Sequence, residues 1–446
     1  MELFKLLLFL VCVPAFAGLN HAPQSFAYKN GKAVFVDFEE ANYKLTYNGA
    51  TQVQTVAATI KFESFEDGYP IFDLVKDPTS VKLDGVNIGQ SLVRTPDNAT
   101  SVRILAEMVK AGVHTLEVSA PLTQTVRYTP QGVNSAFWFS DLDDRSYLEA
   151  YAPANYEFDQ VKMTFDIEFL NLKDQTFYTN GKLTKISENK YHIDFPAYFT
   201  CSSLFFHTAP VGRYPEAKTI FKSLDGRDIP ITLYSTNSSP KLEQMKNNAL
   251  ATLKELENDY GNFPHQTLVI FEAGSGGMEY CGATMTDAGS LSHELTHSYF
   301  ARGIMPANGN AGWLDEAIAS WRDKRYPQSS SMPPSTQMAS HTQYTRMTDR
   351  AAYTRGATFM AYLDKKIKDQ GKGGLKLYLA HLVETQLFSP LVTEEFSKMM
   401  TEFTGVEVKA DFDRVAYGKA PVRGLERETH PLHTKMSLKD YQDLLK

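Results

Sequence analysis

The sequence predicts an α+β fold, with a β-sandwich-like N-terminal domain followed by a mainly helical domain that contains a small sheet. Residues 18–207 show strand-like alternation broken by turn signals, whereas apolar residues after about Pro210 recur at helical spacing. The 446 residues are enough for two or three domains. We expect domains at 18–207 and 208–424, between a leader at 1–17 and a tail at 425–446.

Composition and charge narrow the classes of function. Hydrophobic side chains make up 43% of the chain and charged ones 22%, which is typical of a globular protein. The 45 basic and 52 acidic side chains give a net charge of -7. Such a chain does not attract nucleic acid or an anionic membrane surface electrostatically. We therefore expect no nucleic-acid partner.

The first residues have the pattern of a secretory signal peptide. Lys5 precedes the apolar run Leu6–Val13, and Ala15, Phe16 and Ala17 form an A-x-A cleavage site. The apolar run is far shorter than the roughly 20 residues that cross a bilayer, which argues against an uncleaved anchor. Cleavage near Ala17 predicts an exported chain, periplasmic or extracellular. No later apolar run is long enough for a membrane span in the mature chain.

Two cysteines, Cys201 and Cys281, remain after the leader is removed. An oxidising compartment would allow them to form one disulfide. Two buried thiols agree with the sequence equally well, so the sequence leaves this choice open.

The strands of the first domain are predicted from alternation and turn signals. The clearest strand is 161–169, where apolar and polar residues alternate throughout, so that one face is buried. The dipeptides at 48–49 and 180–181 are both Asn-Gly, which is a hairpin signal. Further strands are expected at Ala33–Phe38, Val53–Phe65, His114–Val118 and Tyr191–Phe195.

The second domain begins with a long amphipathic helix. Ser239 and Pro240 have the pattern of a helix start, apolar residues then recur at helical spacing from Leu242 to Leu256, and Gly261 ends the helix. Residues 266–272 form a short apolar run that is typical of a buried strand. Further helices are expected at Leu291–Arg302, Gly312–Arg325, Arg355–Gln370 and Gly374–Gln386.

The strongest chemical signal is the sequence HELTH at 293–297. His293 and His297 stand four residues apart on a helix and share one face, so both imidazoles can bind one zinc ion. Glu294 between them is directed toward a water on that ion. A catalytic zinc needs a third protein ligand, and Glu316 follows His297 after 18 intervening residues, on the next predicted helix. A site of two histidines and one carboxylate, with one zinc per chain, is therefore predicted.

These residues resemble the zinc signature of the gluzincin aminopeptidases, the family of membrane alanyl aminopeptidase and leukotriene hydrolase. Upstream, the sequence GGMEY at 276–280 is similar to the family's Gly-x-Met-Glu-Asn exopeptidase motif. Downstream, YTRG at 353–356 resembles its Tyr-Glu-Lys-Gly segment. The resemblance implies a thermolysin-like catalytic domain at 208–424, in a short secreted form without the family's C-terminal helical domain.

The resemblance also implies roles for individual residues. It makes His293, His297 and Glu316 the zinc ligands, Glu294 the general base and Tyr353 the donor to the oxyanion. It places the substrate beside Gly276, Gly277, Met278 and Glu279, with Glu279 against the free α-amine of a peptide or protein substrate.

The sequence departs from the family pattern around the amine-binding motif. Only 13 residues separate Glu279 from His293, Tyr280 replaces the usual asparagine, and Cys281 follows it. The family has a second amine-binding side chain on its β-domain, for which Ser140 or Asp141 is the best candidate.

Three alternatives to an aminopeptidase stay open. An open cleft would allow a zinc endopeptidase, and a domain that retains the fold could be a catalytically silent peptide-binding module. Ser275 lies in a relaxed A-x-S-x-G pattern, which would suggest a serine hydrolase if a helix followed directly. The sequence does not determine the preferred N-terminal residue, the natural substrate or the oligomeric state.

Overall fold

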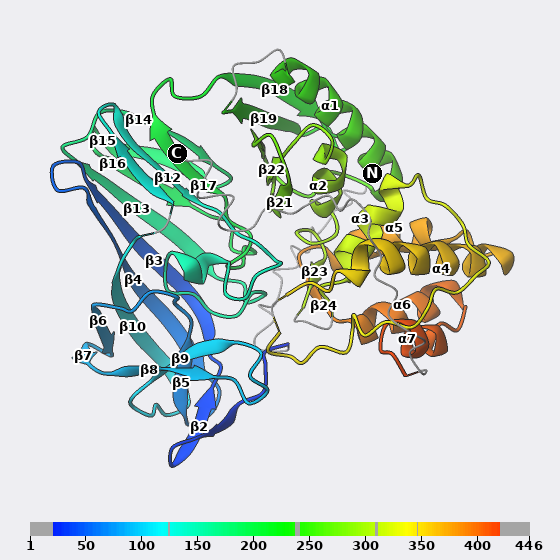
Figure 1. Ribbon diagram of the computed structural model, residues 1–446, viewed down its shortest axis with the longest axis horizontal. Coiled ribbons are helices and arrows are strands. Elements are labelled where there is room, and N and C mark those ends of the chain that lie inside the picture. The colour runs from blue at the N-terminus through cyan, green and yellow to red at the C-terminus, as the bar shows by residue number, and fades with distance from the viewer. Residues whose placement is uncertain (1–20, 124, 237–240, 308–310, 346, 420–446) are drawn as a thin grey trace, which may run out of the picture.

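The computed structural model describes residues 21–123, 125–236, 241–307, 311–345 and 347–419. Sheets dominate the N-terminal half and helices the C-terminal half, and the two halves lie side by side (Figure 1). The fold is thus mixed, with both helices and sheets, as predicted. The predicted signal peptide at 1–17, the tail at 425–446 and the helix-start residues Ser239 and Pro240 lie outside the described residues.

The largest sheet has eight strands in the order β15-β16-β13-β3-β4-β10-β6-β7. The turn at Asn48 and Gly49 joins β3 to β4, with Asn48 opposite Val53, so this predicted hairpin is confirmed. The alternation predicted at 161–169 is also confirmed in β13, where every second side chain is buried. The strands of this eight-stranded sheet are β3 Asp37–Asn48, β4 Val53–Ser64, β6 Ser80–Leu83, β7 Val86–Asn87, β10 Gly112–Pro121, β13 Lys162–Leu170, β15 Lys182–Ser187 and β16 Lys190–Asp194.

A four-stranded sheet, ordered β11-β12-β17-β14, packs on the buried face of the large sheet. The Phe165 ring of β13 lies 5.6 Å from that of Phe137 in β12 and 5.7 Å from that of Phe206 in β17. A third sheet of five strands has the order β1-β2-β5-β9-β8. The strands of these two sheets are β11 Val126–Thr129, β12 Gly132–Phe137, β14 Gln175–Thr179, β17 Phe206–Pro210, β1 Phe26–Tyr28, β2 Gly31–Val34, β5 Tyr69–Phe72, β8 Gln90–Arg94 and β9 Ser101–Leu105.

The hairpin predicted at Asn180 and Gly181 is wrong. These residues connect β14 of the four-stranded sheet to β15 of the eight-stranded sheet, and the two strands do not pair. The Asn180 side chain is buried and donates to the carbonyl oxygens of Ser203 and Cys281. Asn180 therefore bonds to distant parts of the chain, and its Asn-Gly sequence turns the chain from one sheet to another.

The C-terminal half contains a five-stranded sheet, ordered β18-β19-β20-β22-β21. The buried strand predicted at 266–272 is β20, which runs parallel to both of its neighbours. Val269 and Phe271 face the N-terminal sheets, where Phe271 stacks on Trp138 with ring centroids 5.4 Å apart. Leu268 and Ile270 face the helices. The strands are β18 Glu216–Lys222, β19 Asp228–Ser235, β20 Leu268–Glu272, β21 Gly277–Tyr280 and β22 Ala283–Thr286, while β23 Met305–Pro306 and β24 Pro390–Leu391 form a separate pair.

Helices α1 and α2 pack on the other side of this sheet, and the remaining helices continue from them (Figure 1). Most lie within two residues of their predicted bounds, and two regions differ in a way that matters for the site. The helix predicted at 291–302 ends at His297, because the chain turns back and Ala301 adopts a φ of 139°. The helix predicted from Arg355 is preceded by a π-helical turn, Ala352–Gly356. The α-helices are α1 Lys241–Tyr260, α2 Leu291–His297, α3 Leu314–Asp323, α4 Ala357–Asp369, α5 Leu375–Gln386, α6 Thr393–Thr404 and α7 Lys409–Val415, and a 3-10 helix lies at Leu148–Ala150.

Two further sequence questions have structural answers. Among the described residues, no helix has both the length and the apolar composition needed to cross a membrane. Cys201 and Cys281 are both buried, and they are not joined in a disulfide.

Candidate metal centre and active site

Helix α2 brings His293 and His297 together, as their spacing predicts. The two imidazole rings have centroids 4.8 Å apart, and both side chains are buried. Helix α2 begins after the turn that follows β22 and contacts α1, α3 and β21.

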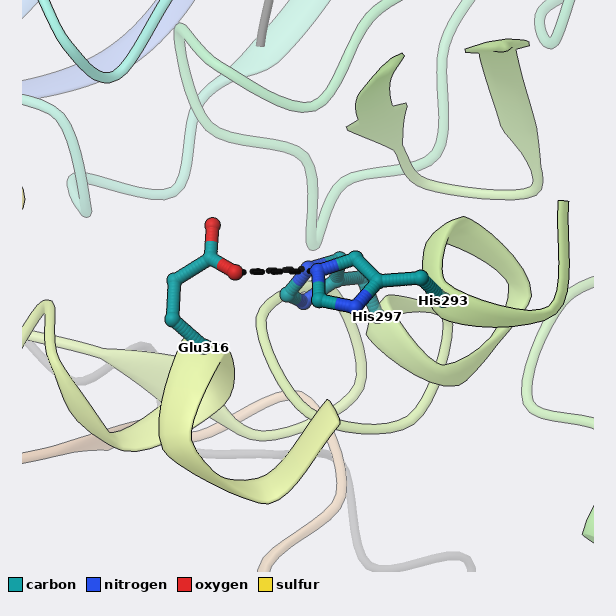
Figure 2. A group of neighbouring side chains, drawn as sticks. All are labelled: His293, His297 and Glu316. Atoms are coloured by element: carbon teal, nitrogen blue, oxygen red, sulfur yellow. Dashed lines mark hydrogen bonds and ion pairs between the residues drawn. The ribbon is translucent and has the colours of Figure 1, made fainter. Parts of the chain in front are cut away.

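Glu316 projects from the first turn of α3 toward both histidines (Figure 2). Its Oε2 lies 3.0 Å from His293 Nε2 and 3.5 Å from His297 Nε2. One ligand atom from each of the three residues can be chosen so that all lie within 4.8 Å of one another. The predicted ligand set therefore meets at one point.

Two further groups fix the orientation of the imidazoles. Asp323, at the end of α3, lies with its Oδ2 2.6 Å from His293 Nδ1. The carbonyl oxygen of Phe300 lies 3.0 Å from His297 Nδ1. Because the Nδ1 atoms are engaged in this way, both Nε2 atoms are directed toward Glu316, which is the arrangement typical of metal-binding histidines.

Carboxylates around the site favour positive charge. Burial by itself would lower the pKa of His293, but hydrogen bonds with Asp323 and Glu316 raise it well above the usual value. Burial likewise opposes charge on His297, and the charges of Glu279 and Glu316 raise its pKa to about 9. A cation that replaces the imidazole protons would experience the same attraction.

The residues fit a zinc ion. His297 Nε2 is buried and has no hydrogen-bond partner among the described residues, so this ligand atom is available to a metal. Two imidazole nitrogens and one carboxylate are the donors of many catalytic zinc sites, where a fourth position stays open to water or substrate. His293, His297 and Glu316 would hold the metal.

Glu294 lies between the metal ligands and strand β21. It is buried, and its carboxylate packs against the α-carbon of Gly277, the first residue of β21. Oxygens of Glu279 and Glu294 and a nitrogen of His297 can also be chosen within 4.8 Å of one another. The structure thus brings the predicted base and the predicted amine-binding carboxylate to the same site.

Glu279 points from β21 into a cavity beside the three-residue site. Its Oε1 accepts a hydrogen bond from Arg302 Nη2 at 3.3 Å. The cavity encloses about 550 Å³, including the part open to solvent. Among its described lining residues, four are acidic and one is basic, namely Asp141, Glu157, Glu279, Asp315 and Arg302. This composition favours a positively charged ligand group.

Tyr353 lies at the same site, on the π-helical turn before α4. Its hydroxyl donates to Glu316 Oε1 at 2.7 Å, and its ring lies nearly parallel to that of His293. Such a turn inside a helix is frequent at functional sites. The hydroxyl is bonded to the third ligand here, so it must exchange that bond in order to reach a substrate oxygen.

The other predicted substrate-binding residues occupy different positions. Gly276 has a φ of 68°, a conformation that glycine adopts without strain. Met278 does not line the cavity, because it faces the opposite side of β21 from Glu279 and is buried in the N-terminal core. Of the two β-domain candidates, Asp141 lines the cavity, whereas Ser140 is buried and accepts a hydrogen bond from the Leu142 amide.

The structure also places two further residues at the site, Asp323 and Arg302, which the sequence motifs do not include. Asp323 stands seven residues after Glu316, so both lie on one face of α3, and this spacing could have indicated a partner for His293. Arg302 gave no such signal, because its contact with Glu279 depends on the turn after α2. Ser275 is followed by strand β21 and not by the helix that a nucleophile elbow requires.

Comparisons with known proteins support the resemblance at the level of the fold. No protein-family model and no curated protein sequence matches the chain. Among solved structures, the M1 zinc metallopeptidase from Deinococcus radiodurans superposes with a TM-score of 0.61 at 15% identity, over 90% of this chain and 96% of that protein. Leukotriene A4 hydrolase from Saccharomyces cerevisiae gives 0.62 at 15% identity, over 89% and 69%. Aminopeptidase A from Legionella pneumophila, solved with aspartic acid, gives 0.65 at 11% identity, over 87% and 50%.

Proposed function

We propose that this chain, which has the fold of the M1 zinc metallopeptidases, is a zinc-dependent aminopeptidase. The observation that carries the proposal is the meeting of the three predicted zinc ligands beside two further buried carboxylates, Glu279 and Glu294. The three ligands would bind a single zinc ion. Glu279 would bind the free amine of a peptide, and Glu294 would act on the attacking water.

The proposed catalytic role of each residue follows from its position. Zinc, when bound, lowers the pKa of water and polarises the scissile carbonyl. Glu294 extends from α2 against Gly277. It takes a proton from the attacking water and delivers it to the leaving amine. The Tyr353 hydroxyl donates to the developing oxyanion after leaving Glu316.

The lining of the cavity supports exopeptidase specificity. Glu279 offers a buried carboxylate to the substrate ammonium, and such a charge-assisted contact is stronger than a neutral hydrogen bond. Asp141 lines the same cavity and is a second acceptor for that ammonium. A carboxylate at a fixed distance from the metal would select the first peptide bond, because only the chain terminus carries the ammonium.

The remaining alternatives have weaker support. An endopeptidase would need the cavity to pass an internal segment of chain, although its acidic lining favours a cation. A silent binding module would not require Glu294 beside the ligands. A serine hydrolase would need a helix directly after Ser275, where strand β21 follows instead.

Two assays test the proposal on the purified mature protein. Metal analysis should find about one zinc per chain, and activity should be lost to a chelator and restored by zinc. A panel of aminoacyl amides and peptides should be cleaved far faster with a free N-terminus than when acetylated, and Glu279→Ala should reduce this selectivity. Cleavage of acetylated peptides at internal bonds by the wild type would replace the aminopeptidase with an endopeptidase. Activity that survives metal removal but not a serine-directed reagent would favour Ser275.

Export is part of the proposal and rests on the pattern of residues 1–17. The mature enzyme would then act on peptides in the periplasm or outside the cell. N-terminal sequencing of the protein from its producing cells should begin at about Gly18. A chain that retains Met1 in the cytoplasm would contradict export without affecting the zinc site.

A further inference from the structure

Arg302 is a buried arginine beside the proposed amine-binding carboxylate. It lies in the turn after α2, and only 5% of its surface is exposed. Its Nη2 donates to Glu279 Oε1 at 3.3 Å, and its Nη1 donates to Ser202 Oγ. One guanidinium therefore links the metal-binding helix, strand β21 and the N-terminal half.

The backbone on both sides of this contact is also fixed. The Arg302 amide donates to the carbonyl of His297, and the Arg302 carbonyl accepts from the Cys281 thiol at 3.6 Å. The Asn180 side chain donates to the carbonyls of Cys281 and Ser203. The guanidinium is thus held by a frame that does not depend on Glu279.

The charges explain why a cation is needed at this point. Glu279 is 2% exposed, and an ionised carboxylate so deeply buried is costly unless a positive group compensates it. Burial would lower the pKa of Arg302, but the charge of Glu279 is the leading influence that raises it above its usual value. The guanidinium therefore stays charged and lies in position to offset the cost of burying the Glu279 carboxylate.

The contact also restricts the geometry of Glu279. A guanidinium is planar and presents its donors in fixed directions, unlike the ammonium of lysine. With Nη2 on Oε1 and Nη1 on Ser202, the carboxylate can rotate little without losing a charged hydrogen bond. Arg302 and Glu279 both line the cavity, so the orientation of this pair decides where the carboxylate presents its remaining acceptor positions.

We propose that Arg302 is a positioning residue that holds the Glu279 carboxylate in the orientation that receives the substrate ammonium. The proposal rests on the aminopeptidase function proposed above. Arg302 acts on substrate recognition through Glu279, whereas the chemical step belongs to Glu294 and the metal. Its loss should therefore impair the binding of free-amine substrates more than turnover.

The test compares Arg302→Met and Arg302→Lys with the wild type. Each is assayed with an aminoacyl amide and with the same compound acetylated at its amine. Arg302→Met should raise KM for the free amine about ten- to a hundredfold, because a buried carboxylate loses its charged partner. The change in kcat should be smaller, and zinc content should stay the same. The KM of Arg302→Lys should lie between those of the wild type and Arg302→Met, because lysine restores the charge without the planar geometry.

Arg322→Met is the matched control. Arg322 is equally buried and donates to Ser292 at the start of α2, but its carboxylate partner is Glu255 and not Glu279. Its loss should lower the unfolding temperature without changing the ratio of kcat/KM for free and acetylated substrates. The comparison therefore distinguishes a variant that is only less stable from one that binds the substrate amine less well.

A double-mutant cycle shows whether Arg302 acts through Glu279. In the Glu279→Gln background, Arg302→Lys should produce no further rise in KM. An equal rise in both backgrounds would overturn the proposal, and so would a wild-type KM in Arg302→Lys. This milder variant keeps the test decisive even if Arg302→Met does not fold. If the wild type itself cleaves both substrates equally well, the aminopeptidase function fails instead.

Discussion

The carboxylate of Glu294 lies against the α-carbon of Gly277, so closely that a β-carbon at position 277 would overlap it. Gly277 begins strand β21 and Glu294 is in the first turn of α2. The glycine therefore leaves the space that the proposed base occupies. This relationship links the exopeptidase-like motif directly to the zinc-binding motif.

Gly277→Ala should remove activity while the protein stays folded and retains zinc. The added methyl group meets the end of the Glu294 side chain, which can rotate away, and no backbone atom stands among its nearest contacts. Displacing a general base should lower kcat by roughly 10²-fold or more. Gly89→Ala is the control, because its nearest contact is 3.5 Å away. Metal content, circular dichroism and kcat check the outcome, and near wild-type turnover would contradict it.

Tyr353→Phe should lower kcat by roughly 10²- to 10³-fold, as expected when a donor to the oxyanion is removed. The hydroxyl also bonds to Glu316, so the variant could act by weakening the metal site. Kinetics at increasing zinc concentrations distinguish these effects. The loss should persist at saturating zinc, whereas full recovery would restrict Tyr353 to orienting Glu316. Tyr362→Phe, which removes a hydroxyl that contacts Asp411, serves as the control.

Asp323→Ala should weaken zinc binding by about 10- to 100-fold, because Asp323 orients and polarises His293 through Nδ1. The zinc affinity is measured by competition with a chelator of known strength. Asp369→Ala removes an exposed carboxylate at the end of the neighbouring helix α4 and should leave the affinity unchanged. Equal affinities in the two variants would show that His293 is oriented by its surroundings without Asp323.

The sequence predicts that the proposed zinc ligands meet, because their geometry is local or nearly so. Two histidines four residues apart on a helix share a face in any fold, and Glu316 lies on the next helix. Met278 shows the opposite case, since its place in the motif suggested substrate contact. The two-residue period of a strand turns Met278 into the core and Glu279 toward the site, which alternation alone could have indicated.

Other features could not be predicted because they depend on distant partners. The turn at Asn180 and Gly181 has hairpin chemistry, yet the Asn180 side chain bonds to Ser203 and Cys281. The contact of Arg302 requires α2 to end at His297, whereas the apolar pattern predicted a longer helix. Local propensity predicts that a turn and a helix occur in these segments. Hydrogen bonds to distant residues decide how the turn connects and where the helix ends.

The buried His207 should make the protein less stable in mild acid. Burial lowers the pKa of His207 to about 3, so the folded protein keeps it neutral while the unfolded chain takes up a proton below about pH 6.5. Stability therefore falls as the pH drops from 6.5 toward 3, by up to about 1.4 kcal/mol per pH unit for this group.

Urea unfolding at pH 5 and pH 7 measures this contribution. His207→Gln should show a smaller difference between the two pH values than the wild type, although it is less stable at both because His207 bonds to Tyr234 and Asn134. His192 provides a contrast, since hydrogen bonds with Asp166 and Asp194 raise its pKa. It contributes stability at low pH that is lost as the pH rises, so His192→Gln should change the difference in the opposite direction. Equal differences in wild type and His207→Gln would refute the assignment.

Asp141 should share the substrate ammonium with Glu279. It is 5% exposed, comes from the N-terminal half and lines the cavity that Glu279 enters from β21. Two carboxylates from different halves of the chain would hold the ammonium from two sides, which would fix the distance between the amine and the metal. Asp141→Asn should therefore lower kcat/KM for a free-amine substrate by about tenfold or more, as for loss of a charged hydrogen bond. The slow hydrolysis of the acetylated compound should stay the same, because that compound carries no ammonium. Asp143→Asn changes the same charge two residues away, at a position that does not line the cavity, and should match the wild type. An equal fall for both substrates would mean that Asp141 supports the cavity wall and does not bind the amine.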